Sequence, residues 1–383
     1  MTSHVSDTTQ VTPLFQLAAC GQSYWLDNLS RRMIRSGELT RRVSEEGLRG
    51  ITSNPTTFHT AITGSADYDR QIEELARAGV TTKDLFEALM VSDVQEACDL
   101  LRPVYESSDR LDGYVSLEVS PHFAHDAHRT MDHARRLFGL VSRPNVTIKI
   151  PGTPAGVPAI EEMLYEGLNI NITLLFSIQN YQAVAEAYLR ALERRVGDNA
   201  RIDGIASVAS FFVSRVDTLI DQLLGHRMDG DDRSKGTIPA QLLGRAAVAN
   251  ARVAYKYFKQ IFAGERWTKL VKQGARVQRV LWASTGRKNP SYSDVGYVEP
   301  LVGRETVNTM PEATIRAFAD HGRVVADSVE ADVEESLEAL RQLENVGIDY
   351  RCVTWQLENE GIQKFIDSYD ACIQAIDKKR KPG

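Results

Sequence analysis

The feature that most constrains this fold is a series of eight short runs rich in β-branched residues, most of them separated by helical stretches. Such alternation predicts parallel strands joined by crossover helices. Eight strands on 383 residues favour an α/β fold of the closed (β/α)8 type, the TIM barrel, over an open doubly wound sheet. The predicted strands are 24–27, 50–53, 114–119, 146–150, 169–175, 204–208, 279–284 and 306–309.

The organisation around the barrel follows from the same pattern. We expect a single domain, with the barrel over 13–321, an extra N-terminal helix at 13–20 and a helical C-terminal extension over 322–383. Residues 1–12 are polar and are predicted to be a disordered tail. Other apolar residues recur at helical spacing, which predicts helices at 28–36, 69–77, 83–105, 126–140, 155–166, 180–195, 213–224, 241–262 and 312–321.

Three smaller segments also carry expectations. Residues 225–237 are predicted to form a polar surface loop, because glycine and charged residues dominate them. An extended piece is expected near 351–355 within the C-terminal extension. The basic run at 378–381 is predicted to be a frayed, solvated end.

Composition and missing motifs exclude several classes of partner. A formal net charge of −6 and dispersed basic residues argue against a nucleic-acid-binding protein. No apolar run is long enough to span a bilayer, and the polar N-terminus resembles no secretory signal, so we expect no membrane partner. Four scattered cysteines favour reduced thiols and a cytoplasmic protein. A homo-oligomer is compatible with the sequence, and the nucleotide-binding glycine fingerprints are absent.

Lys149 is the most informative single residue. It lies inside the apolar run Val146–Pro151, although lysine is depleted from strands and seldom buried. A strand covered on both faces would hold the amine in poor solvent, and desolvation favours the neutral, nucleophilic form of an amine. Lys149 is therefore a candidate for a Schiff-base lysine. The alternative is a strand-end lysine whose amine reaches water.

Two carboxylates occupy comparable positions on other predicted strands. Asp27 ends the first strand and Glu118 lies in the third, each beside apolar residues. Buried charges are costly unless paired, and strand ends of a barrel converge on one mouth. An amine, two carboxylates and several hydroxyls are what a lysine aldolase requires. Other polar residues at strand ends are hydrogen-bonding candidates, or ordinary strand termini: Thr52, Asn54, Asn171, Thr173, Ser207, Ser210 and Ser284.

Basic residues after the later strands predict an anion site. Arg215 follows the sixth strand, and Arg287 and Lys288 follow the seventh. Loops after the later strands of such barrels commonly bind phosphate, and cations there suit an anionic substrate. The alternative is ordinary surface charge.

A histidine-rich stretch raises the question of a metal. His122, His125, His128 and His133 include the spacing H-x-x-H-x-x-H. On a helix the first and third members of that spacing point in different directions, and no acidic partner completes a zinc template. We therefore expect no metal site at these histidines.

Several motifs together resemble those of transaldolase, in its longer bacterial form. They occur in order over about residues 20–320 and fall on at least six predicted strands. The segments that carry the resemblance are 50–58 (GITSNPTTF), 146–151 (VTIKIP), 167–177 (GLNINITLLFS), 282–286 (WASTG), 288–290 (KNP) and 307–311 (VNTMP).

The resemblance implies roles for individual residues. Lys149 would form a Schiff base with C2 of a ketose, and Glu118 would act as acid and base through a water held by Thr173. Asp27 would accept the hydroxyl proton during carbon–carbon cleavage. The bound dihydroxyacetone unit would be held by Thr52, Asn54, Asn171 and Ser210.

The implied phosphate ligands are Arg215 and a second cation. Short members of the family carry an arginine two residues after the seventh-strand serine, here Ser284, but this chain has Gly286 there. Either Arg287 or Lys288 would have to replace it. The C-terminal 60 residues carry no recognisable motif, and we expect them to cover the barrel or the mouth of the site.

The implied reaction transfers a dihydroxyacetone unit from sedoheptulose 7-phosphate to glyceraldehyde 3-phosphate. Its products are erythrose 4-phosphate and fructose 6-phosphate, in the non-oxidative pentose phosphate pathway. The resemblance implies no metal and no organic cofactor. Three alternatives stay open: an aldolase of the fructose-6-phosphate type, a metal-dependent hydrolase that uses the histidines, and a non-catalytic sugar-phosphate binder. The hydrolase and the binder do not explain Asp27, Glu118 and Lys149 together.

Overall fold

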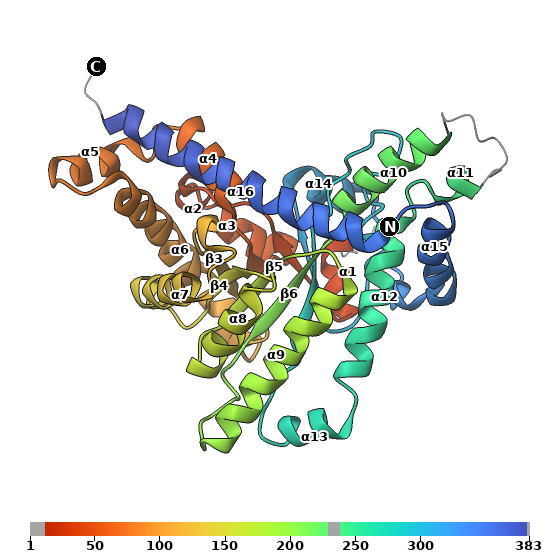
Figure 1. The fold of residues 1–383 in the computed structure, drawn as a ribbon. Helices are drawn as coiled ribbons and strands as arrows, with labels where there is room; N and C mark the ends of the chain where they lie inside the picture. The colour runs from red at the N-terminus through yellow and green to blue at the C-terminus, as the bar shows by residue number, and fades with distance from the viewer. Residues whose placement is uncertain (1–11, 229–237, 381–383) are drawn as a thin grey trace, which may run out of the picture.

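A computed structural model describes residues 12–228 and 238–380 of the chain. Eight parallel strands close into a barrel in chain order, with β1 paired to β8, which confirms the predicted (β/α)8 fold (Figure 1). The strands are β1 (Gln22–Leu26), β2 (Gly50–Ile51), β3 (Tyr114–Glu118), β4 (Val146–Pro151), β5 (Ile170–Leu175), β6 (Ser207–Phe212), β7 (Arg279–Ala283) and β8 (Thr306–Met310).

Helices surround the barrel, and additional helices precede and follow it. The helices before β5 are α1 (Pro13–Ala19), α2 (Arg31–Arg35), α3 (Glu38–Arg41), η1 (Arg42–Glu46), α4 (Pro55–Gly64), α5 (Asp69–Arg77), α6 (Thr82–Ser107), η2 (Pro121–Phe123), α7 (Ala127–Val141) and α8 (Gly156–Glu166). Those after it are α9 (Ile178–Gly197), α10 (Ser214–Met228), α11 (Ile238–Leu242), α12 (Ala246–Ile261), α13 (Glu265–Val271), η4 (Glu299–Leu301), α14 (Glu312–His321), η5 (Ser328–Glu330), α15 (Val333–Asn345) and α16 (Tyr350–Arg380).

The barrel interior is polar over part of its length. Side chains alternate between the two faces of a strand, so hydroxyls and amides of neighbouring strands meet inside. The Thr147 hydroxyl donates to Ser116 Oγ at 2.9 Å, and Asn171 Nδ2 donates to the same oxygen at 2.9 Å. Ser210 Oγ donates to Asn171 Oδ1 at 2.7 Å. These bonds satisfy buried polar groups that would otherwise destabilise the fold.

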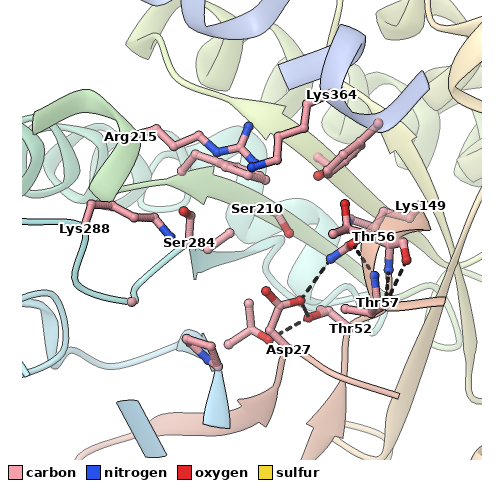
Figure 2. A pocket seen from close by; sticks show the side chains of 18 residues that line it. Asp27, Thr52, Thr56, Thr57, Lys149, Ser210, Arg215, Ser284, Lys288 and Lys364 are labelled. Carbon is pink, nitrogen blue, oxygen red and sulfur yellow. Dashed lines mark hydrogen bonds between the residues drawn. The ribbon is translucent and has the colours of Figure 1, made fainter. Parts of the chain in front are cut away.

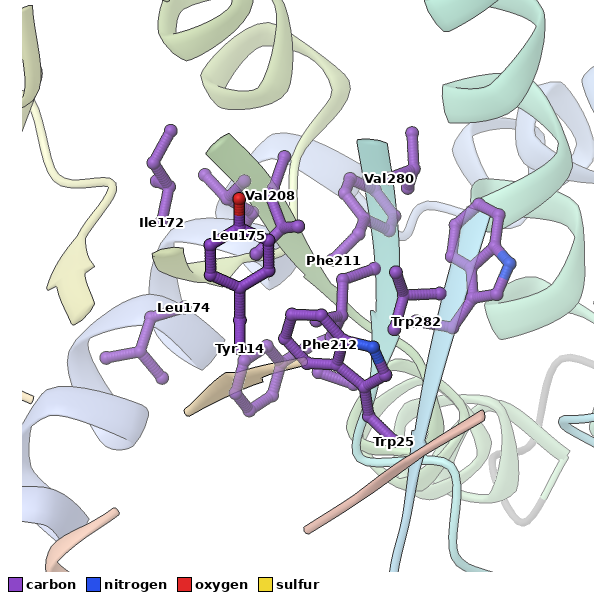
Figure 3. Packing of buried hydrophobic residues seen from close by; sticks show 14 of the residues in the cluster. Trp25, Tyr114, Ile172, Leu174, Leu175, Val208, Phe211, Phe212, Val280 and Trp282 are labelled. Carbon is purple, nitrogen blue, oxygen red and sulfur yellow. The ribbon is translucent and has the colours of Figure 1, made fainter. Parts of the chain in front are cut away.

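The opposite faces of the strands pack beneath the helices in the hydrophobic core (Figure 3). Phe211 of β6 lies edge-on to Trp282 of β7 and to Tyr181 of α9, with ring centroids 6.3 Å apart in both pairs. The Trp282 indole N–H donates to Leu301 O at 2.9 Å, so burial leaves its polar atom satisfied. This packing joins two barrel strands to the surrounding helices.

Close approach to Trp25 explains the glycine that opens β2. A Cβ built on Gly50 would lie 2.4 Å from the Trp25 ring, and Trp25 is fully buried. No side chain larger than hydrogen fits there without displacing a rigid indole. The short strand β2 therefore depends on a single residue type at its first position.

The long helix α16 crosses the barrel near the C-terminal ends of the strands (Figure 1). Polar contacts fix it to segments from distant parts of the chain: Thr56 and Ser368 hydroxyls lie 2.8 Å apart, and Asn180 Nδ2 donates to Glu358 Oε2 at 2.5 Å. The Cys372 thiol contacts Pro55 O at 3.5 Å. The C-terminal residues thus lie over the barrel mouth.

Two predicted elements in the later half of the barrel have different bounds. The sixth strand runs over Ser207–Phe212 instead of 204–208, because Val208 to Phe212 pair with Arg279 to Ala283 of β7. The helix predicted at 241–262 is interrupted between α11 and α12. Gly244 has φ +67° there, and its N–H donates to Asp221 Oδ1 at 2.9 Å. Helical backbone cannot continue through that conformation.

Two predictions for the C-terminal extension were wrong. Residues 351–355 are helical, because the Asp349 carboxylate accepts from the N–H groups of Arg351 and Cys352 at 2.9 and 3.3 Å and begins α16. The basic run is not frayed as far as Arg380. Lys379 Nζ donates to Asp69 Oδ1 at 2.6 Å, and Arg380 Nη1 donates to the Thr82 hydroxyl at 2.6 Å.

Other segments are only partly tested. The polar stretch at 225–237 begins inside α10, which continues to Met228, and 229–237 lie outside the described residues. The predicted tail at 1–11 and the last basic residue, Lys381, also lie outside them. No helix in the described ranges combines the length and apolar character that a bilayer crossing requires.

Candidate active site

A cavity of about 220 Å³ opens at the C-terminal ends of the strands (Figure 2). Eight parallel strands bring their carboxyl ends to this mouth, so residues far apart in the chain meet there. Of the residues singled out in the sequence, nine line the cavity: Asp27, Thr52, Asn54, Lys149, Thr173, Ser210, Arg215, Ser284 and Lys288. Glu118 and Asn171 do not line it but contact residues that do. Ser207 was wrongly placed at this mouth: it begins β6 at the other end of the barrel, where Gln278 Nε2 donates to its hydroxyl at 3.0 Å.

Lys149 projects from β4 into the inner end of the cavity and is 4% exposed. Its Nζ donates to Ser53 O at 3.2 Å and lies 3.1 Å from Glu118 Oε2. The Phe365 ring centroid lies 5.5 Å from Nζ. The amine is therefore enclosed by one carboxylate, one carbonyl and an aromatic face, with the cavity on its remaining side.

Glu118 is placed beside Lys149 by strand register, since the two residues are direct partners between β3 and β4. Burial raises the pKa of the Glu118 carboxyl to about 6, although the positive charge of Lys149 opposes that shift. Apart from the ion pair, neither carboxylate oxygen accepts a well-aligned hydrogen bond within the described chain. The nearby strand β5 contributes Thr173, whose buried hydroxyl also has no partner there. Both groups can exchange protons with a small polar molecule.

Asp27 follows β1 and lines the cavity beside Thr52 (Figure 2). The Thr52 hydroxyl donates to Asp27 Oδ1 at 3.0 Å and lies 2.7 Å from the Thr309 hydroxyl. Desolvation raises the pKa of the Asp27 carboxyl, and the charge of Lys149 opposes this effect. A carboxylate that is desolvated and held by one hydroxyl is suited to accept a proton.

The Asn54 side chain makes two contacts at the start of α4. Its Oδ1 accepts from Thr57 N at 3.1 Å and caps the helix, which fixes the side chain at the cavity wall. Its Nδ2 lies 3.5 Å from Asp27 Oδ1. The sequence Asn54-Pro55-Thr56-Thr57 is a helix-start signal, so one short motif both begins α4 and supplies cavity residues.

Asn171 is the one predicted binding residue whose side chain is fully occupied inside the barrel. Its amide bonds to Ser116 and Ser210, and it is fully buried. Strand pairing also places it directly beside Lys149. Asn171 therefore orients Ser210, which does line the cavity.

Positive side chains surround the outer end of the cavity. Arg215 lies in the first turn of α10, and its guanidinium is 5.3 Å from the Phe212 ring. Lys288 comes from the loop after β7 and lines the cavity, whereas Arg287 points elsewhere and donates to Pro290 O and Tyr292 O, each at 3.3 Å. Of the two cations after β7, Lys288 and not Arg287 can therefore contact an anion bound in the cavity. Desolvation, together with the charges of Arg215 and Lys364, lowers the pKa of Lys288.

Ser284 lies at the end of β7 with φ +55°, a left-handed conformation that is uncommon for serine. Its hydroxyl lies 3.1 Å from that of Ser214 at the start of α10. Backbone strain of this kind concentrates at functional sites. The conformation directs the chain toward Gly286 and Lys288, which line the cavity.

Sequence reasoning missed several cavity residues. Lys364 and Phe365 come from α16, for which no motif gave a signal. Thr56 and Thr57 lie inside the segment that carries the resemblance and could have been found from the helix-start pattern. The remaining missed residues are Phe212, Ala283, Gly286, Thr309 and Pro311.

The histidines do not gather around a common point. His122 Nε2 lies 2.8 Å from Asp370 Oδ1. His133 lies elsewhere, with Nδ1 accepting from Ser120 N at 3.0 Å and Nε2 3.0 Å from Glu87 Oε2. Within residues 12–228 and 238–380, no three His, Cys, Asp or Glu side chains are grouped as metal ligands.

Comparison with known proteins bears on what such a cavity does. A family model described as "Transaldolase/Fructose-6-phosphate aldolase" matches residues 24–376. A curated protein of a Nostoc species named "Transaldolase 2" is 46% identical over 375 residues, covering 97% of this chain and 98% of its own length. "Transaldolase" of Trichodesmium erythraeum is 45% identical over 374 residues, covering 96% of this chain and 97% of its own length.

Proposed function

Because the chain belongs to the transaldolase/fructose-6-phosphate aldolase family, we propose that it transfers a dihydroxyacetone unit from sedoheptulose 7-phosphate to glyceraldehyde 3-phosphate through a Schiff base on Lys149. The products are erythrose 4-phosphate and fructose 6-phosphate. One observation carries the assignment of residues: a buried lysine amine 3.1 Å from a buried carboxylate, inside a cavity whose other end is cationic. That combination suits a substrate with a carbonyl at one end and a phosphate at the other.

The first half of the reaction forms the Schiff base. After losing a proton, the Lys149 amine attacks the ketose C2 carbonyl and gives a carbinolamine, which loses water to become an iminium ion. Glu118 supplies and removes protons in these steps, through a water held by the Thr173 hydroxyl. Its pKa of about 6 supports this role, because acids and bases work best when their pKa lies near the working pH.

The second half breaks and remakes a carbon–carbon bond. Asp27 accepts the proton of the C4 hydroxyl, the C3–C4 bond breaks, and its electron pair flows to the iminium nitrogen to give an enamine. The aldose leaves with a new aldehyde. Glyceraldehyde 3-phosphate then enters, the steps run in reverse, and fructose 6-phosphate is released. Support for Asp27 comes from its raised pKa and from its place in the same cavity, close enough for the charge of Lys149 to act on it.

The remaining residues hold the two ends of the substrate. Thr52, Asn54 and Ser210 line the inner cavity and would bind the dihydroxyacetone hydroxyls, with Asn171 holding Ser210 in place. Ser284 lies between these residues and the cations and would contact the aldose portion. Arg215 and Lys288 would bind the phosphate.

Organisation and location are part of the same proposal. The barrel and α16 share one core, which extends from Leu14 to Ile376, and this supports a single domain. Within the described chain the four cysteines are free thiols, which favours a cytoplasmic location. A homo-oligomer stays a prediction.

Borohydride trapping tests the mechanism. Incubation with fructose 6-phosphate and borohydride should leave a reduced three-carbon adduct on Lys149, read by intact and peptide mass. The Lys149→Met variant should give no adduct and lose at least about 10³-fold in kcat, because the nucleophile is gone. Lys288→Met is the matched control, since it removes a cavity lysine yet should still form the adduct. An adduct on another lysine, or none in the native protein, contradicts the mechanism.

Acceptor dependence separates the transferase from an aldolase that releases dihydroxyacetone to water. With fructose 6-phosphate alone, little free dihydroxyacetone should accumulate. Addition of erythrose 4-phosphate should produce sedoheptulose 7-phosphate at a much higher rate. Equal turnover with and without the aldose acceptor would identify the aldolase instead.

A further inference from the structure

The helix α16 contributes two consecutive residues to the cavity, Lys364 near the outer cations and Phe365 beside Lys149. We propose that Lys364 is a third phosphate-binding residue, which acts with Arg215 and Lys288 to make this site prefer phosphorylated aldoses over phosphate-free ones. The proposal rests on the function proposed above and assigns a substrate-recognition role to the C-terminal helix.

The first supporting observation is that no described residue forms an ion pair with any of these three cations, although the Asp27 and Glu360 carboxylates attract Arg215 from a longer distance. Within the described chain, Arg215, Lys288 and Lys364 form no ion pair and no hydrogen bond, although most other surface arginines there are paired with carboxylates. Three like charges around one cavity repel each other. Burial lowers the pKa of Lys288, and the charges of Arg215 and Lys364 lower it further. An arrangement of this kind is stabilised by an anion between the charges.

The second observation is that the three cations line two cavities at once. The inner cavity contains Lys149, and an outer one of about 580 Å³ lies between α10 and α16. Arg215, Lys288 and Lys364 belong to the walls of both. Figure 2 shows Arg215 and Lys364 extending into the cavity from its upper side and Lys288 from the loop beside Ser284. An anion at their meeting point closes the inner cavity and can be reached from the outer one.

The third observation is that packing fixes the segment of α16 that bears Lys364. Gly361, one turn earlier, lies against β5 and α10. A Cβ there would come within 2.9 Å of Leu174 and 3.4 Å of Arg215 Nη1. Phe365, directly after Lys364, is 3% exposed. Lys364 itself is exposed, but its backbone is held between buried neighbours, so its amine is confined to the mouth of the cavity.

The chemistry favours a phosphate monoester as the anion. Such a group carries between one and two negative charges near neutral pH and accepts several charge-assisted hydrogen bonds. One guanidinium and two ammonium groups supply enough charge and donors for it. A singly charged carboxylate would leave more of the cationic charge uncompensated, and a neutral sugar would leave all of it.

The test compares Lys364→Met with the native enzyme using two acceptors that differ only in the phosphate, glyceraldehyde 3-phosphate and D-glyceraldehyde. We expect KM for glyceraldehyde 3-phosphate to rise about tenfold or more, because a charge-assisted contact is lost. Values of kcat, and kcat/KM for D-glyceraldehyde, should stay within about twofold. Lys364→Arg should restore most of the affinity for the phosphorylated acceptor.

Lys378→Met is the matched control, because it removes an exposed lysine from the same helix outside both cavities. This variant should leave KM and kcat/KM for both acceptors unchanged. Unfolding midpoints of all variants should agree, which separates lost recognition from lost structure. The proposal would be overturned if Lys364→Met lost kcat/KM equally with both acceptors, or lost none with glyceraldehyde 3-phosphate. If the native enzyme trapped no adduct on Lys149, the proposed function itself would fail, and that result is independent of the acceptor ratio.

Discussion

The two ends of the barrel treat buried charge in opposite ways. At the N-terminal end of the strands, Arg279 Nη1 donates to Asp112 Oδ1 at 3.0 Å, and Nη2 donates to Ser23 Oγ and Thr306 O, each at 2.6 Å. Ser23 in turn donates to Asp112 Oδ2 at 2.7 Å. At the C-terminal end, Arg215 and Lys288 have no charged partner in the described chain, and Glu118 has only Lys149.

The difference is between charged groups whose partners all lie within the barrel and charged groups that have few or none there. A buried ion pair surrounded by hydrogen bonds has little capacity left to interact with anything else. Groups without such partners at the other end keep the capacity to bind a ligand, at a cost in stability. Composition and burial alone would not distinguish the ends, since Arg279 and Lys149 are both 4% exposed. Their hydrogen-bond partners do.

The largest expected effect is that of Arg279→Met on stability. It leaves the Asp112 carboxylate buried without its cation, and should lower the free energy of unfolding by about 3 to 5 kcal/mol. The kcat of the remaining folded enzyme should change less than about twofold, because the cavity is at the other end. Urea unfolding and steady-state assays at low temperature measure the two quantities.

Arg304→Met serves as the control for that comparison. Arg304 is 78% exposed and lies 3.8 Å from Asp327, so its loss should change stability by less than about 0.5 kcal/mol. A large loss of kcat in folded Arg279→Met enzyme would mean that the two ends are not independent.

The next effect concerns pH and Glu118. Its pKa of about 6 in the folded protein exceeds the ordinary value of 4.5, so the folded state binds this proton more tightly than the unfolded state. Its contribution to stability is therefore fully present below pH 4.5 and is lost as pH rises through 6. The stability of Glu118→Gln relative to the native protein should rise by about 1 to 2 kcal/mol between about pH 4.5 and pH 7.

Urea unfolding of both proteins at several pH values measures that difference. Asp112→Asn, at the other end of the barrel, is the variant with which the pH dependence of Glu118→Gln is compared. It should destabilise the protein across the same range, because Arg279 loses its partner. A Glu118→Gln difference that is constant with pH would show that this carboxylate does not titrate in the predicted window.

The smallest expected effect is a difference in KM between variants of the adjacent residues Arg287 and Lys288. Lys288→Met should raise KM for glyceraldehyde 3-phosphate about tenfold through loss of one charged contact. Arg287→Met should leave KM within about twofold, since Arg287 already donates to Pro290 and Tyr292 carbonyls away from the cavity. Steady-state kinetics of the two variants measure this directly. The reverse order would place Arg287, and not Lys288, at the phosphate.

Much of the barrel was predictable because its strands follow a local rule. Runs of β-branched residues between helical stretches fix the number and order of the strands, and parallel pairing then brings Glu118 and Lys149 into register. The charged residues are conspicuous because each interrupts an apolar run. The amino-acid sequence alone is therefore enough to group Asp27, Glu118 and Lys149 at one mouth of the barrel.

The errors arose where tertiary contacts decide the outcome. β6 extends to Phe212 because its aromatic residues continue the ladder with β7, which propensity alone does not show. The piece near Val353 is helical and not extended as predicted, because the Asp349 cap and the burial of Val353 and Leu357 favour a helix. Gly244 is a local signal for the break between α11 and α12, but the apolar spacing on either side of it continues as if the helix were unbroken.

Lys364 and Phe365 could not have been predicted from sequence. Nothing near them indicates a strand end, and their place at the cavity depends on how α16 lies over the barrel. That packing involves residues from α4, α9 and α10, which are far away in the chain. Local patterns contain no information about contacts of that kind.

The path of α16 has a consequence for the order of events during synthesis. Its anchoring bonds join Thr56 to Ser368 and Thr82 to Asp377, pairs separated by 312 and 295 residues. At ordinary rates of translation, about 15 to 60 s pass between the emergence of the two halves of such a pair. The strands can pair during that interval, but the mouth of the barrel stays uncovered. Closure of the cavity is therefore among the last steps of folding, and Lys149 of a nascent chain stays uncovered until α16 arrives.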